Sequence, residues 1–154
     1  MTAAAKARLT AIIVAAGGGT RMGGEVEKQF RLFARKPVLA HSVEAFLQHP
    51  ATERVVVVAA ETRMDTAKAA IGDLAGDERV LITAGGDRRQ DSVRAGLALA
   101  ADDAALVAIH DAARPLLPQG IITGLVAAME ESGAHHIMAA LPVLPVTDTL
   151  KSVN

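Results

Sequence analysis

Two cationic residues follow a glycine-rich segment near the start of the chain. The segment "AAGGGTRMG" covers residues 15–23 and contains Arg21, and Lys28 follows it in "EKQF". Glycine has no Cβ, so the main-chain N–H groups of such a loop can approach a phosphate closely. A guanidinium and an ammonium beside it can neutralise a polyphosphate and the charge that develops in nucleotidyl transfer. The segment therefore predicts a phosphate-binding site, with a simple tight turn as the alternative.

The glycine segment matches neither of the two common phosphate-binding motifs. A dinucleotide fingerprint G-x-G-x-x-G/A that starts at Gly17 has Met22 at its third required position. A P-loop that starts at Gly18 fails because glycine and glutamate stand where the motif needs lysine and a hydroxyl residue. A nicotinamide-dependent dehydrogenase is therefore disfavoured.

A carboxylate follows an apolar stretch later in the chain. Asp111 comes directly after "ALVAIH", residues 105–110, and belongs to the segment "HDAARP". A carboxylate at the end of a strand can hold Mg²⁺, which takes few protein ligands and completes its shell with water and phosphate oxygens. Capping of a following helix is the alternative interpretation.

Short β-branched stretches alternate with longer segments of helical periodicity. The stretches are almost continuously apolar, as strands covered on both faces are. They cover residues 9–15, 53–60, 79–84, 105–110 and 136–141. Apolar residues recur at a spacing near 3.6 within 39–47, 93–100 and 122–129, the last between Pro118 and Gly133. The alternation predicts an α/β fold with a mostly parallel sheet and helices on both faces.

Length and composition fit one globular domain and exclude several classes of function. The chain has 154 residues, of which 51% are hydrophobic and 21% charged, with a formal net charge of -1. This charge balance does not favour nucleic acid as a partner, and only three phenylalanines represent the aromatic residues. Cysteine is absent, which is compatible with the cytoplasm. Residues 9–15 fall short of the roughly 18 apolar residues of a membrane span, so we expect no membrane association.

Four segments together resemble a known enzyme family. "AAGGGTRMGGEVEKQF" resembles the signature loop of nucleotidyltransferases that activate small phosphorylated metabolites. Three further segments, in this order, narrow the resemblance to the 2-C-methyl-D-erythritol 4-phosphate cytidylyltransferase family of the non-mevalonate isoprenoid pathway. They are "GGDRRQDSV" (85–93), "HDAARP" (110–115) and "PVTDTLK" (145–151). The resemblance runs from Ile12 onward and implies a Rossmann-like, three-layer nucleotidyltransferase fold. It also implies attack of the substrate's phosphate oxygen on the α-phosphorus of CTP, with pyrophosphate leaving.

The resemblance also implies roles for individual residues. Arg21 and Lys28 would be catalytic cations on the triphosphate, Asp111 would bind Mg²⁺, and Thr149 would bind methylerythritol phosphate. The residues that would bind the nucleotide are Ala15, Ala16, Gly17, Gly18, Gly19, Gly86, Asp87, Ser92, Ala112 and Arg114. We expect His110 to orient the loop or to pack, because this reaction has little need for a base at neutral pH.

The remaining residues of "GGDRRQDSV" carry weaker expectations. We interpret Asp91 as an N-cap of the helix that carries Val93. The role of Arg88 and Arg89 is left open: they either belong to the binding site or are a pair of solvated surface side chains. The four other histidines are expected to be structural.

The end of the chain resembles the start of the family's protruding arm, which exchanges between subunits. The resemblance therefore implies a homodimer formed through an arm after residue 140. Because the family's further site residues come later, we interpret residues 1–154 as one nucleotidyltransferase domain truncated within this arm. Whether the parent is a bifunctional fusion is left open. Two other functions remain: a sugar-phosphate or molybdenum-cofactor nucleotidyltransferase of the same fold, and a non-catalytic nucleotide-binding module.

Overall fold

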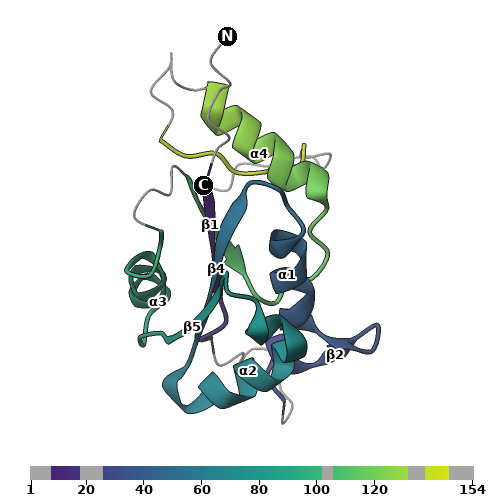
Figure 1. The fold of residues 1–154 in the computed structure, drawn as a ribbon, viewed down its shortest axis with the longest axis vertical. Coiled ribbons are helices and arrows are strands. Elements are labelled where there is room, and N and C mark those ends of the chain that lie inside the picture. Colours follow the sequence, from purple (N-terminus) through teal and green to yellow (C-terminus); the bar gives the residue numbers. More distant parts are fainter. Residues whose placement is uncertain (1–7, 18–25, 102–105, 132–137, 146–154) are drawn as a thin grey trace, which may run out of the picture.

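A parallel four-stranded sheet forms the centre of the chain (Figure 1). The computed structural model describes residues 8–17, 26–101, 106–131 and 138–145. The strands of the sheet are β1 (Leu9–Val14), β4 (Thr52–Ala59), β5 (Val80–Ala84) and β6 (Leu106–Asp111). Their order is β5-β4-β1-β6, and all three pairings are parallel. The sequence prediction of a mostly parallel sheet is confirmed.

Helices cover both faces of this sheet (Figure 1). On one face lies α3 (Arg89–Leu97), and on the other lie α1 (Val38–Leu47) and α2 (Met64–Ile71). Ile122 of α4 (Gln119–Glu131) belongs to the same core cluster as the α1 residues. The three-layer arrangement predicted for the chain is therefore confirmed. Among the described residues, no helix has the length and apolar character that a membrane crossing needs.

Neighbouring residues of the central strands belong to different cores. Ile12 of β1 packs with Val56 and Val58 against the side of the sheet that carries Ala95. Ile13, the next residue, packs into the larger core with the α1 residues. Successive side chains of a strand point to opposite faces, so both faces need apolar residues. This is why the central strands β1 and β4 read as continuous rather than alternating apolar runs. The expectation of cover on both faces is wrong for the edge strand β6, where Val107 and Ile109 are 39% and 48% exposed.

The chain also contains a small hairpin that the sequence analysis did not predict. Strands β2 (Leu32–Phe33) and β3 (Lys36–Pro37) pair antiparallel. Their two-residue turn places Ala34 and Arg35 at φ of 47° and 66°. This left-handed geometry usually selects glycine or asparagine, so the turn has no recognisable signal in the sequence. The short 3₁₀ helix η2 (Lys28–Phe30) lies just before the hairpin.

The strand predicted for residues 136–141 is wrong where the structure describes it. Residues 138–145 form neither helix nor strand. Met138 and Leu144 are each 90% exposed, so this apolar stretch does not pack in the core. An extended segment becomes a strand only when a neighbour accepts its main-chain hydrogen bonds, and none of the described strands pairs with residues 138–145. Residues 136 and 137 lie outside the described residues.

Candidate active site

A cavity of about 930 Å³ lies at the carboxyl end of the sheet. Every sequence-predicted site residue that the structure describes lines it. These are Ala15, Ala16, Gly17, Lys28, Gly86, Asp87, Ser92, Asp111, Ala112 and Arg114. Gly18, Gly19, Arg21 and Thr149 lie outside the described residues. Ligands of open α/β sheets bind outside the carboxyl ends of the strands, so the location fits a binding site.

The pairing of β1 with β6 brings the glycine segment beside Asp111. Val14, the last residue of β1, stands opposite Asp111 in the parallel register. The Ala112 N–H donates to the Val14 carbonyl at 3.1 Å, and the Ala15 N–H donates to Val58 at 2.7 Å. Both loops therefore leave the sheet at the same level, with their first residues fixed by main-chain hydrogen bonds.

The loop before α3 passes tightly against that helix. A Cβ on Gly85 would lie 2.5 Å from the Ser92 hydroxyl oxygen, and one on Gly86 would lie 2.6 Å from the Asp91 Cβ. Ser92 is 1% exposed, and its hydroxyl lies within donating distance of the Gly86 carbonyl at 3.4 Å. The two glycines thus have a structural reason to be present, whatever they bind. The predicted nucleotide contacts of Gly86 and Ser92 remain predictions.

Asp91 stabilises the start of α3, but not from the predicted position. The N-cap is Arg88, and Asp91 is the third helical residue. Its carboxylate accepts from the Arg88 main-chain N–H at 3.3 Å and pairs with the Arg88 guanidinium at 3.1 Å. The prediction that Asp91 is the N-cap is therefore wrong by three positions. The loop geometry explains the shift, because Arg88 already has extended backbone dihedral angles at the helix start.

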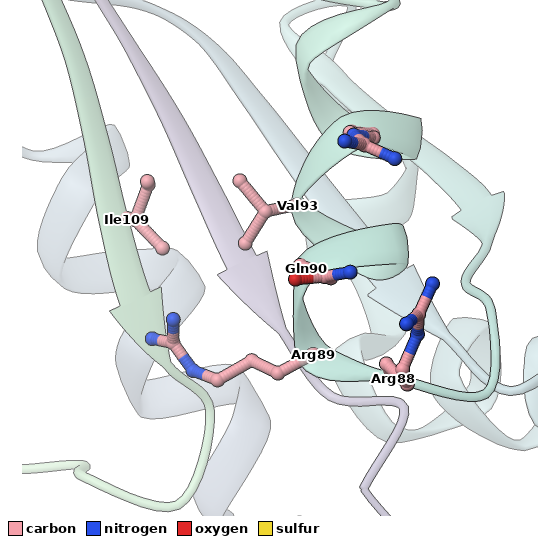
Figure 2. A pocket seen from close by; sticks show the side chains of 6 residues that line it. Arg88, Arg89, Gln90, Val93 and Ile109 are labelled. Atoms are coloured by element: carbon pink, nitrogen blue, oxygen red, sulfur yellow. The ribbon is translucent and has the colours of Figure 1, made fainter.

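Asp111 forms two ion pairs at the edge of the cavity. Its Oδ1 lies 3.0 Å from Arg89 Nη2, and its Oδ2 lies 3.2 Å from Arg114 Nε. Arg89 extends from α3 toward the strand that carries Ile109, whereas Arg88 points away from that strand (Figure 2). The two adjacent arginines therefore differ in role: Arg88 pairs within its own helix, and Arg89 connects α3 to the proposed site. The residue types alone leave this difference between Arg88 and Arg89 open, and the structure resolves it.

The donor set at Asp111 suits one kind of magnesium site. Within the described part of the chain, no group of three or more His, Cys, Asp or Glu side chains could hold a metal. Mg²⁺ commonly binds through one or two carboxylates and takes its remaining ligands from substrate phosphates and water. A single carboxylate beside the start of the glycine segment, which the sequence predicts to bind phosphate, fits that pattern.

His110 packs and orients the loop, as expected. Its Nε2 lies 3.0 Å from the Arg114 carbonyl, and its ring meets that of Phe46 edge to face at 5.5 Å. Burial lowers the pKa of His110 below its ordinary value, and this is the largest influence on it. The neutral ring donates from Nε2 to the Arg114 carbonyl and thereby fixes the turn that follows Asp111.

Comparison with known proteins decides the family. The family described as 2-C-methyl-D-erythritol 4-phosphate cytidylyltransferase matches residues 9–154. The chain belongs to this family. A bifunctional IspD/IspF enzyme of Rhizorhabdus wittichii is 46% identical over 145 residues, covering 94% of this chain and 35% of that protein. A 2-C-methyl-D-erythritol 4-phosphate cytidylyltransferase of Rhodococcus jostii is 41% identical over 149 residues, covering 97% of this chain and 62% of that protein.

Solved structures agree with this assignment. A crystal structure described as 4-diphosphocytidyl-2C-methyl-D-erythritol synthase matches with a TM-score of 0.69 and 28% identity, covering 98% of this chain and 66% of that one. The bifunctional IspDF of Campylobacter jejuni matches with a TM-score of 0.67, covering 81% of this chain and 31% of that one, and its 22% identity supports the fold alone. This cytidylyltransferase family member spans 35% and 62% of the length of the two curated relatives above.

One residue that the sequence analysis passed over is built into the cavity wall. Gln29, next to Lys28, is 4% exposed, and its side-chain amide donates to the Ala15 carbonyl at 2.9 Å. The only signal in the sequence is a polar residue between Lys28 and the aromatic residue Phe30. That signal is too weak to single it out, because its partner is 14 positions away.

Proposed function

We propose that this chain is the CTP-binding part of a cytidylyltransferase. The reaction joins CTP to 2-C-methyl-D-erythritol 4-phosphate and gives CDP-methylerythritol and pyrophosphate, in isoprenoid precursor biosynthesis. The observation that carries the proposal is the single cavity in which Lys28, Asp111 and the start of the glycine segment meet, in a chain of this family. Because the chain spans only part of its relatives' length, the activity is proposed for the whole protein.

Charge and positioning are the chemical contributions that we assign to the site. A phosphate oxygen of the substrate forms the new bond to the α-phosphorus of CTP, and the bond to pyrophosphate breaks. No covalent enzyme intermediate is needed, so fixed cations and correct alignment supply most of the rate. Lys28 faces the cavity and is the described cation assigned to the triphosphate. Arg21 is proposed for the same role from the sequence.

The main chain supplies much of the proposed nucleotide recognition. Ala15, Ala16 and Gly17 begin the phosphate loop, and a Cβ built on Gly17 would meet no atom of the described residues within 4 Å. This open space allows a close approach to phosphate oxygens. Gly86, Asp87, Ser92, Ala112 and Arg114 line the same cavity and are assigned to the cytidine and the ribose, as the family resemblance implies.

We propose Asp111 as the protein ligand of Mg²⁺. A bound Mg²⁺ would neutralise part of the triphosphate charge. Each oxygen of Asp111 is paired with one guanidinium, so a bound Mg²⁺ would compete with Arg89 and Arg114 for the negative charge of this carboxylate. Phosphate groups bind guanidinium strongly, so a triphosphate in the cavity offers Arg89 and Arg114 alternative partners.

The proposal includes a homodimer and a cytoplasmic location. The support for the dimer is the resemblance of residues 145–151 to the start of the family's exchanging arm, which would bring Thr149 to the partner's substrate. Reaction between two charged, water-soluble metabolites supports the cytoplasmic location.

A nucleotide panel with the full-length gene product tests the proposed function. Pyrophosphate release is measured with CTP, GTP or UTP, each with 2-C-methyl-D-erythritol 4-phosphate or with a hexose 1-phosphate. We expect release only with CTP and methylerythritol phosphate. Release with UTP or GTP and the hexose phosphate would favour another nucleotidyltransferase of the same fold. Binding of CTP without release in any combination would favour a non-catalytic nucleotide-binding module.

A further inference from the structure

The side-chain amide of Gln29 connects two segments that the proposed reaction needs in fixed positions. Its Nε2 donates to the Ala15 carbonyl at 2.9 Å and to Glu27 Oε2 at 2.8 Å, with the Gly17 carbonyl at 3.3 Å as a further acceptor. Ala15 and Gly17 begin the glycine segment, whereas Glu27 precedes Lys28. One buried side chain therefore joins the end of β1 to the short helix η2 that carries Lys28.

Glu27 is itself fixed from the opposite side. Its Oε1 accepts from Arg63 Nε at 3.0 Å, while Oε2 accepts from Gln29. Arg63 ends the 3₁₀ helix η3 (Glu61–Arg63), and α2 follows directly. A continuous row of polar contacts thus runs from the beginning of α2, through Glu27 and Gln29, to the carbonyl of Ala15.

Lys28 lies between the two residues that form this tether. The side chains of Glu27 and Gln29 are directed into hydrogen bonds, and Lys28 lines the cavity. Two main-chain hydrogen bonds close the turn. The Phe30 N–H donates to the Glu27 carbonyl at 3.0 Å, and the Arg31 N–H donates to the Lys28 carbonyl at 3.3 Å. The position of the lysine relative to the phosphate loop is therefore set by its two neighbours.

We propose that Gln29 is a positioning residue that holds Lys28 at a fixed place relative to the start of the glycine segment. The tether follows from the hydrogen bonds alone, and its effect on turnover rests on the proposed function. A cation that is already in place when charge develops needs no reorganisation during the reaction, so a tether of this kind acts mainly on the transition state. Gln29 itself touches no reacting atom in this proposal.

A second glutamine in the chain provides a matched control. Gln119 of α4 also donates from Nε2 to a main-chain carbonyl, that of Ala45 in α1, at 2.7 Å. Gln119 is not among the residues that line the cavity. Gln29→Leu and Gln119→Leu therefore remove the same kind of bond by the same substitution, one beside the proposed site and one away from it.

The first measurement is amide hydrogen exchange in the full-length protein, read at Phe30 and Arg31. We expect Gln29→Leu to accelerate exchange at these amides about 10-fold or more, because their turn loses its fixed anchor, and Gln119→Leu to leave them unchanged. Equal exchange in the two variants would overturn the tether. This measurement requires no nucleotide, so it decides the tether even if the protein releases no pyrophosphate and the proposed function fails.

The second measurement is steady-state turnover with CTP and methylerythritol phosphate. We expect Gln29→Leu to lower kcat by about 10- to 100-fold with a smaller change in KM for CTP, since a misplaced transition-state cation affects kcat most. Gln119→Leu should keep kcat within about 2-fold of the wild type, because Gln119 does not line the cavity and its substitution leaves the site intact. Unchanged kcat in Gln29→Leu would overturn the positioning role and leave a purely structural bond.

Gln29→Glu keeps the inference testable if the leucine variant does not fold. Glutamate has nearly the same shape, but its carboxylate cannot donate to the Ala15 carbonyl and repels the carboxylate of Glu27. We expect the same faster exchange and lower kcat as for the leucine variant. Wild-type exchange and kcat in Gln29→Glu would contradict the proposal.

Discussion

The Arg89 guanidinium lies 3.0 Å from the Asp111 carboxylate and connects helix α3 to the end of strand β6. Arg114 pairs with the other carboxylate oxygen at 3.2 Å. The carboxylate proposed to bind Mg²⁺ is thus the shared partner of two arginines that line the same cavity. Metal binding and these ion pairs compete for the same oxygens, so the strength of the pairs sets part of the metal affinity.

Removing Arg89 should therefore strengthen metal binding in the absence of nucleotide. We expect Arg89→Ala to bind Mn²⁺, a spectroscopic substitute for Mg²⁺, about 2- to 5-fold more tightly, because an exposed ion pair contributes at most about 1 kcal/mol. Electron paramagnetic resonance titration of the free ion measures this. Arg88→Ala is the control, since Arg88 pairs with Asp91. Equal Mn²⁺ affinity in Arg89→Ala and the wild type would show that the ion pair does not compete.

Removing the carboxylate should abolish the metal dependence of nucleotide binding. We expect Asp111→Asn to bind CTP with the same affinity in the presence and absence of Mg²⁺, because its amide cannot replace a charged ligand of a hard cation. Isothermal titration calorimetry measures both conditions. Asp65→Asn, at an exposed position in the first turn of α2, should behave like the wild type. A Mg²⁺ response that survives in Asp111→Asn would place the metal elsewhere.

Lys28→Ala should lose turnover while the protein stays folded. Removal of a charge partner of the transition state costs about 3–4 kcal/mol, so we expect kcat to fall roughly 10²- to 10³-fold. Lys68→Ala on α2 is the matched control, since Lys68 does not line the cavity. Pyrophosphate release and a thermal melt of each variant separate catalysis from stability. Wild-type turnover in Lys28→Ala would remove this lysine from the mechanism.

Two glycine-to-alanine substitutions should change stability in opposite directions. A Cβ on Gly85 would lie 2.5 Å from Ser92 Oγ and 2.9 Å from the Ala16 Cβ, so we expect Gly85→Ala to lower the free energy of unfolding by about 1–3 kcal/mol. A Cβ on Gly124 in α4 meets no atom within 4 Å in the part of the chain that the structure describes. Gly124→Ala should therefore raise the free energy of unfolding by about 0.5–1 kcal/mol. Urea denaturation measures both, and equal effects would contradict the close packing at Gly85.

Stability should decrease with acidification through His110. Burial lowers the pKa of His110 in the folded chain, so below the ordinary histidine value of 6.5 the unfolded chain binds the proton first. The free energy of unfolding therefore falls as the pH drops from 6.5 toward the lowered pKa, and above 6.5 this residue contributes no pH dependence. His110→Phe should show a flatter profile between pH 7 and 5 than the wild type. Parallel profiles in urea denaturation would contradict the assignment.

The sequence predicts the sheet and much of the site because their signals are local. Continuous apolar runs identify β1 and β4, and motif positions such as Lys28 and Asp111 do converge on one cavity. The hairpin turn at Ala34 was missed because alanine gives no sign of a positive φ. Helix α2 was missed because it buries little besides Ala67 and Ile71, so it lacks a wide apolar stripe.

The long-range contacts of the site could not be predicted in the same way. Gln29 reaches a carbonyl 14 positions earlier, and Arg89 reaches a carboxylate 22 positions later. Neither partner is visible from spacing or residue type, because the sheet order brings them together only after folding. The strand prediction at 138–141 is wrong for a related reason. Residues with a preference for extended structure form a strand only when another strand lies beside them, and residue type does not show whether one does.

Because β1 contributes to two cores, a substitution in this strand can be directed at the packing on either face of the sheet. Ile12 faces the α3 side, and Ile13 faces the α1 side, although they are adjacent in sequence. A cavity-creating change at Ile12 would loosen the packing under α3, where a Cβ on Gly96 would already meet the Ile12 side chain at 2.5 Å. The same change at Ile13 would loosen the core that packs against α1. The packing on each side of the sheet can therefore be altered by a substitution at one of these two positions.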